Sequence, residues 1–172
     1  MENNEDFKKY FDSKNYITKI IGVEEEEKEE EGKLIKTEDK ISKIINLLTD
    51  PANKSFKEAT LLNLKKEKGG DLLLLAIASP KADKNRHQLV AACWESEINF
   101  SKYLPFFILL ALDADYLVSL EAMTVMSTME GPFEKDMLNN AIKKVKEVQK
   151  NITSEKAVLL NDLVYTLEGF IE

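Results

Sequence analysis

Residues 71–97 read DLLLLAIASPKADKNRHQLVAACWESE, and this stretch decides the fold that we expect for the chain. The segment Asp71–Ala78 is apolar almost throughout and stops at Ser79-Pro80, because the residue before a proline is disfavoured in the helical region. After a short turn, apolar side chains recur at helical spacing as far as Glu97, and Asp83 is placed to cap this second helix. The stretch therefore predicts a hairpin of two helices.

The residues before this stretch predict a similar hairpin. One helix starts after Thr37, which can cap it, and ends at Asp50-Pro51. The next helix runs from about residue 53 to residue 66 and is broken by Gly69-Gly70. We expect this second helix to bury the face that carries Phe56, Ala59, Leu62 and Leu61.

The residues after it predict a third hairpin. Ser101 can cap a helix over residues 102–112, with Pro105 in the first turn, where a missing N–H costs little. Asp115 can cap the next helix, which ends at Gly131-Pro132. An apolar stripe on this last helix leaves Ser119, Thr124 and Ser127 to one side and consists of Val118, Ala122, Val125 and Met129.

The C-terminal part predicts two further helices. Pro132 can open the first, and Thr153 can cap the second. The apolar residues of that last helix are Val158, Leu159, Leu163, Leu167 and Phe170. No convincing strand follows residue 40, so we expect an all-α fold.

The hairpins repeat along the chain. A shift of 32 positions places Asp83 on Asp115 and Val90 on Ala122, so helix matches helix and turn matches turn. A first copy beginning near Asp50 is fainter. A period of this size with two helices per unit is typical of an α-solenoid, whose units bury their apolar faces by stacking on their neighbours.

Two segments resemble the HEAT-repeat pattern of an aspartate turn followed by a small-residue helix. Asp83-Lys84-Asn85-Arg86 precedes Leu89-Val90-Ala91-Ala92, and Asp113-Ala114-Asp115 opens the next copy. The resemblance covers residues 38–130 and extends to armadillo-like α-solenoids. It implies a right-handed α-α superhelix of stacked antiparallel hairpins that serves as a binding surface, with Asp83 and Arg86 in a structural ladder. Only one copy carries the arginine and the units are short, so TPR-like or irregular bundle packing remains an alternative.

The N-terminal segment differs from the rest. Apolar residues between Phe7 and Ile21 recur at roughly helical spacing, and the run Glu24–Glu31 contains seven glutamates and one lysine. Repulsion within this run favours a disordered linker, with a continuous solvated helix as the alternative. We therefore predict a partly flexible N-terminal helix and acidic linker over residues 1–36, and a helical repeat domain over residues 37–172.

The composition excludes several classes of protein. A net charge of −7 and a single arginine do not suit a nucleic-acid backbone, and one cysteine with one histidine cannot build a four-ligand zinc site. The longest apolar run, residues 103–112, is half the length of a membrane span. The first residues lack the pattern of a signal peptide, so we expect a cytoplasmic protein that binds neither nucleic acid nor membrane.

The sequence carries no coherent catalytic, cofactor or metal motif. His87 and Cys93 are six positions apart on one helix, a rotation of about 600°, so they lie on separate faces. The segment Asp113-Ala114-Asp115 lacks the later ligands of a calcium loop, and Gly69-Gly70 lacks the lysine of a phosphate loop. We expect no catalytic residue, no cofactor and no metal.

These observations favour a non-enzymatic scaffold that mediates protein–protein interaction. Large or charged side chains on second helices are its candidate interaction residues, namely Arg86, Trp94, Glu95, Tyr116 and Glu121. One alternative is an acidic inhibitory or immunity-type protein that binds a basic partner. Another is a helical enzyme or small-ligand domain with a groove that the sequence does not reveal. The partner and the oligomeric state stay open.

Overall fold

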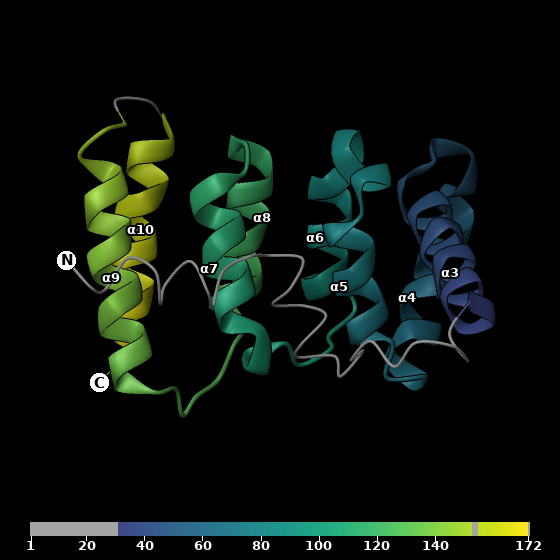
Figure 1. The fold of residues 1–172 in the computed structure, drawn as a ribbon, viewed down its shortest axis with the longest axis horizontal. Coiled ribbons are helices and arrows are strands. Elements are labelled where there is room, and N and C mark those ends of the chain that lie inside the picture. The colour runs from purple at the N-terminus through teal and green to yellow at the C-terminus, as the bar shows by residue number, and fades with distance from the viewer. Residues whose placement is uncertain (1–30, 153–154, 172) are drawn as a thin grey trace. The chain divides into compact units, whose positions relative to one another are not determined.

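The computed structural model describes residues 31–152 and 155–171, and these residues form eight α-helices and no strand. The expectation of an all-α fold is therefore confirmed for this part of the chain. The chain divides into two compact units between Ile98 and Asn99, and each unit is described by itself. Figure 1 labels the helices from α3 onward.

The first unit consists of two antiparallel helix pairs. Its elements are α3 (Glu31–Thr49), the 3₁₀ helix η1 (Pro51–Phe56), α4 (Lys57–Lys66), α5 (Gly70–Ala78), the 3₁₀ helix η2 (Pro80–Asn85) and α6 (Arg86–Glu95). Helix α3 packs against α4, α5 and α6. The core lies around α5, whose Leu73, Leu74, Ala76 and Ile77 are fully buried.

The second unit also consists of two pairs. Its elements are the 3₁₀ helix η3 (Ser101–Tyr103), α7 (Leu104–Asp113), α8 (Tyr116–Ser127), α9 (Lys135–Gln149) and α10 (Glu155–Gly169). Helix α7 packs on α8 and α9, and α10 packs on α8 and α9. Within this unit, Figure 1 shows α8 and α10 behind α7 and α9, so the four helices form two layers.

Most of the predicted helix ends are confirmed. Asp50-Pro51 ends α3, and the Asp50 side chain accepts a hydrogen bond from the Ala52 N–H at 2.9 Å. Asp115 caps α8 by accepting from the Val118 N–H at 3.0 Å. Pro105 lies in the first turn of α7, as expected. At these positions the side chain or the proline ring acts on backbone atoms only a few residues away.

Five predicted helix starts and one predicted helix end are wrong. Helix α4 begins at Lys57 instead of near residue 53, and α8 ends at Ser127 instead of at Gly131-Pro132. Helix α3 begins at Glu31, so Thr37 lies inside it. The helix extends this far because residues 31–36 are mostly good helix formers. Asp83 lies in η2, and α6 begins three residues later. The Ser101 hydroxyl, instead of capping α7, accepts a hydrogen bond from the N–H of Glu130 at 3.1 Å. Helix α9 begins at Lys135, three residues after Pro132.

The predicted buried face of α4 is also wrong. Phe56 and Leu62 are more than half exposed, whereas Leu64 is buried. Both sides of this short helix carry apolar residues, so the spacing alone does not identify the side that meets the core. Two other predicted positions also differ. Val158 of α10, which was predicted to be in the core, is exposed, whereas Ser119 of α8, which was predicted to lie off the apolar stripe, is buried. The Ser119 hydroxyl donates to the Asp115 carbonyl at 2.8 Å.

Other predictions lie outside the described residues. They are the N-terminal helix, the acidic run up to Glu30 and the Thr153 cap. No helix in the described part of the chain has the length and apolar character that crossing a membrane requires. The division into residues 1–36 and 37–172 stays a prediction.

The end of α4 is closed by a Schellman motif. The Gly69 N–H donates to the Leu64 carbonyl at 2.7 Å, and the Lys68 N–H donates to the Lys65 carbonyl at 3.3 Å. A Cβ on Gly69 would lie 2.7 Å from the Leu64 side chain, so this position needs glycine. Lys68 itself has a φ of 55°, the left-handed conformation in which glycine is preferred.

We expect Lys68→Gly to raise the free energy of unfolding by up to about 1 kcal/mol, because glycine adopts this conformation without the steric cost of a Cβ. Denaturant unfolding measures the change. The matched control is Lys66→Gly inside α4, which should lower the free energy of unfolding by about 1 kcal/mol. If both substitutions destabilised the protein equally, the proposed role of the left-handed residue would be wrong.

Candidate functional site

The residues that the sequence singled out for interaction lie on α6 in the first unit and on α8 in the second. Arg86 is engaged within its own unit: its Nε donates to the Ile77 carbonyl at 3.0 Å, and its Nη1 lies 3.3 Å from the Asp83 carboxylate. These contacts tie the start of α6 to the end of α5. Arg86 therefore supports the fold of its hairpin.

Glu95 is engaged as well. Its two carboxylate oxygens lie 2.8 and 2.7 Å from Lys57 Nζ, and both side chains are partly buried. A second pair joins α4 to the residues just after α6, with Lys65 Nζ 2.5 Å from a Glu97 oxygen. The hydrogen bond and the charge of Lys65 hold the pKa of Glu97 below its usual value. Long charged side chains thus link α4 to the end of α6.

Trp94 and Tyr116 are the two predicted residues with large exposed rings. Their exposed fractions are 40% and 41%, respectively. Because they belong to different units, each has to be considered with its own neighbours. Trp94 has Glu95 beside it, whereas Tyr116 begins a helix with further exposed apolar side chains.

An apolar surface on α8 brings Tyr116 together with two residues that sequence reasoning missed. Leu117 is 52% exposed and Leu120 is 38% exposed. Leu120 follows Tyr116 by four positions and Leu117 by three, so its side chain lies beside both on the helix surface. Glu121 follows Leu120 directly. We call Tyr116, Leu117 and Leu120 the α8 face. Its members escaped notice because α8 also has a complete inward stripe, which is buried as predicted and consists of Val118, Ala122, Val125 and Met129.

The charges around the α8 face have one sign. Residues 103–134 contain no lysine, arginine or histidine. The acidic residues in this range are Asp113, Asp115, Glu121, Glu130 and Glu134. An apolar patch with an acidic border therefore marks this part of the second unit.

Lys156, the lysine of α10, donates its hydrogen bonds to backbone carbonyls. Lys156 Nζ donates to the Leu112 carbonyl at 2.7 Å and to the Ala114 carbonyl at 2.5 Å. Partial burial lowers the pKa of Lys156, while the carboxylates of Asp113 and Asp115 act in the opposite direction. Lys156 thus satisfies carbonyls at the end of α7 and fixes the first turn of α10 beside the start of α8.

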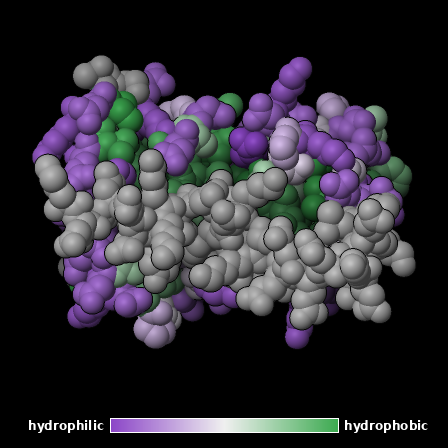
Figure 2. Space-filling model, in the orientation of Figure 1, coloured by the Kyte–Doolittle hydropathy of each residue, from purple (hydrophilic) through white to green (hydrophobic). Residues whose placement is uncertain are grey.

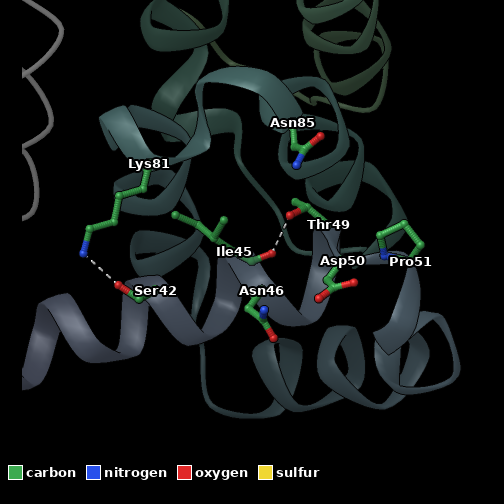
Figure 3. Close-up of a pocket in the computed structure, with 8 residues that line it drawn as sticks. All are labelled: Ser42, Ile45, Asn46, Thr49, Asp50, Pro51, Lys81 and Asn85. Carbon is green, nitrogen blue, oxygen red and sulfur yellow. Dashed lines mark hydrogen bonds between the residues drawn. The ribbon is translucent and has the colours of Figure 1, made fainter.

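The first unit contains a shallow, open pocket of about 380 Å³ between α3, η1 and η2, shown in Figure 3. Lys81 Nζ donates to the Ser42 hydroxyl at 2.9 Å, and the Thr49 hydroxyl donates to the Ile45 carbonyl at 2.8 Å. The lining residues are Ser42, Ile45, Asn46, Thr49, Asp50, Pro51, Lys81 and Asn85. Ser42 and Lys81 are thus bonded to each other, and Thr49 is bonded within α3.

Cys93 belongs to the core. It is fully buried, its Sγ lies 3.7 Å from the Leu89 carbonyl, and burial raises the pKa of its thiol well above the usual value. Such a thiol is a poor nucleophile, because the thiolate is the reactive form. Among the described residues, no three His, Cys, Asp or Glu side chains are grouped as a metal site would require.

Comparison of the chain with protein-family models, curated proteins and solved structures finds no match. The resemblance to HEAT repeats is therefore not supported by any of the three comparisons. The case for a function rests on the residues and contacts described above.

We expect Lys156→Met to lower the free energy of unfolding by about 1–3 kcal/mol, because the carbonyls of Leu112 and Ala114 lose their charged donor. Thermal or denaturant unfolding measures the loss. The matched control is Lys143→Met on the exposed side of α9, which should change the free energy by no more than about 0.5 kcal/mol. Equal stability of the two variants would show that the Lys156 bonds contribute nothing.

Proposed function

We propose that this chain is a non-enzymatic helical-repeat scaffold that binds another protein through the α8 face. The observation that carries the proposal is the exposure of three large side chains, Tyr116, Leu117 and Leu120, at adjacent positions of one helix. Single exposed apolar residues are ordinary, but contiguous apolar patches on soluble proteins often mark interaction sites. Tyrosine is also enriched among the residues that dominate binding energy.

The backbone under this face is well supported. The Asp115 cap fixes the first turn of α8, and the opposite side of the helix is buried around Val118 and Ala122. A partner would therefore meet side chains on a helix that is already formed. Binding to a preorganised surface loses less conformational entropy than binding to a loop that must first be ordered.

We also propose that the helix pairs of the whole chain stack as a HEAT-like right-handed superhelix. The 32-residue spacing of Asp83 and Asp115 supports this arrangement, as does the packing of pair on pair inside each unit. The Asp83–Arg86 ion pair agrees with what the resemblance implies. No specific observation favours the enzymatic alternative: the pocket is shallow and open, and Cys93 is buried in the core.

The superhelix can be tested by a distance between the first and last pairs. Spin labels on Asn63→Cys and Asn161→Cys mark exposed positions of α4 and α10, and Cys93 is too buried to be labelled. We expect a separation of about 25–30 Å, since three steps of 8–10 Å separate the first pair from the fourth in a stack. A distance below about 20 Å would mean that the pairs fold back on one another.

The α8 face can be tested by replacing its two leucines. We expect the double variant Leu117→Ser/Leu120→Ser to lose at least about 90% of partner capture, because the central apolar contact is removed. Its stability should change little, since both side chains are exposed. Quantitative capture from a lysate of the native cells measures the loss for each recovered protein.

The matched control removes two exposed apolar residues from the other unit. Phe56→Ser/Leu62→Ser removes two exposed apolar side chains at the end of η1 and on α4, and should leave capture at the level of the unmodified chain. If the α8 variant retained every partner, or if both variants lost the same partners, the α8 face would not be the binding surface.

A further inference from the structure

We propose that the partner segment on the α8 face is a basic amphipathic α-helix, with apolar residues at helical spacing and lysine or arginine on either side of them. The inference rests on the proposed function and adds the chemical class of the partner. Two features carry it: Tyr116, Leu117 and Leu120 are exposed together on α8, and every charged residue in the segment 103–134 around α8 is acidic.

Helix α10, which packs on α8, also carries exposed apolar side chains. Val158 is 64% exposed and Tyr165 is 73% exposed, and they lie seven residues apart, so they share one side of the helix. Helix α10 packs on α8, and the Lys156 bonds place its first turn beside the start of α8. Val158, two residues after Lys156, therefore lies at the same end of the layer as Tyr116 and Leu117.

The size of this surface suits a helix. Val158 and Tyr165 are about 10 Å apart along α10, which corresponds to two turns. A partner helix with apolar residues at positions i, i+4 and i+7 presents a stripe of the same length. An amphipathic helix laid on an apolar surface is a common mode of peptide recognition.

The acidic residues around the α8 face favour a positively charged partner. Asp113 and Asp115 are exposed beside the start of α8, and Glu155 and Asp162 are exposed on α10. Lys156 is the lysine of α10, and its ammonium group is bonded to carbonyls. Complementary charges steer association and exclude wrong partners. Nucleic acid and anionic membranes would be repelled by this border, whereas a cationic peptide would be attracted.

Helix α9 provides an internal contrast. Its exposed side carries Lys143, Lys146 and Lys150, and Figure 2 shows hydrophilic residues gathered over this helix at the left of the view. Lys146 also pairs with Glu168 at 2.9 Å. The second unit thus has a lysine-rich helix in one layer and an acidic, apolar surface in the other. A peptide that bound through charge alone would bind the lysine-rich helix if it were acidic and the acidic surface if it were basic.

The test uses the full chain and three labelled synthetic peptides of about 15 residues, the length of a typical helix. All three carry the same leucine stripe, and the remaining positions are lysine, glutamine or glutamate. We expect fluorescence anisotropy to show that the lysine peptide binds at least about tenfold more tightly than the glutamine peptide, and that the glutamate peptide binds weakest. Raising the salt concentration should reduce this preference.

Variants locate the binding site. Leu117→Ser/Leu120→Ser should weaken binding of the lysine peptide by about tenfold or more, and Phe56→Ser/Leu62→Ser should leave it unchanged. Asp113→Asn/Asp162→Asn should reduce the advantage of the lysine peptide over the glutamine peptide by about threefold or more while leaving binding of the glutamine peptide unaltered.

The outcomes separate this inference from the function on which it rests. If the three peptides bound equally and all depended on Leu117 and Leu120, the face would bind helices but the basic class would be wrong. If the lysine peptide bound without regard to these leucines, or if none of the peptides bound, the inference would be overturned. The function itself fails when the α8 variant also retains every captured protein, or when the Phe56→Ser/Leu62→Ser control loses the same proteins.

Discussion

Helices α5 and α7 have almost no polar side, and this constraint shapes both units. Gly70–Ala78 and Leu104–Asp113 carry apolar residues all around the helix, and most of them are buried. A helix of this kind must be surrounded, because each large side chain left in water forgoes about 1.5–3 kcal/mol of burial free energy. Each unit meets the requirement by packing neighbouring helices around the apolar one.

The covering helices need only one apolar side, and most of them have one. Helix α9 follows this rule, with Leu138, Ala141 and Val145 buried and lysines outside. Helix α8 does not: it buries a full stripe and still exposes Leu117 and Leu120. Nothing in the packing of the second unit requires these two leucines. This exposed apolar surface, which the fold does not need, is the observation on which the proposed interaction rests.

The sequence predicted the parts of the fold that depend on local chemistry. Ser79-Pro80, the Asp115 cap and Pro105 were all located, because a proline or a capping carboxylate acts on atoms a few residues away. The buried side of α4 was missed because the face predicted from Phe56 and Leu62 competes with the side that carries Leu64, which is the one that is buried. Only the neighbouring helices decide which side becomes the core.

The candidate site illustrates the same limit. Arg86 and Glu95 were chosen for their residue types, yet their charged groups are engaged by Ile77, Asp83 and Lys57 within the first unit. Tyr116 was also chosen by type, and it lies in an exposed apolar group whose leucines could not be recognised without the fold. A residue type shows what a side chain can bind, but its neighbours decide whether that capacity is already used. On α8 the exposed ring and the leucines beside it are the groups that the inward stripe leaves available to a partner.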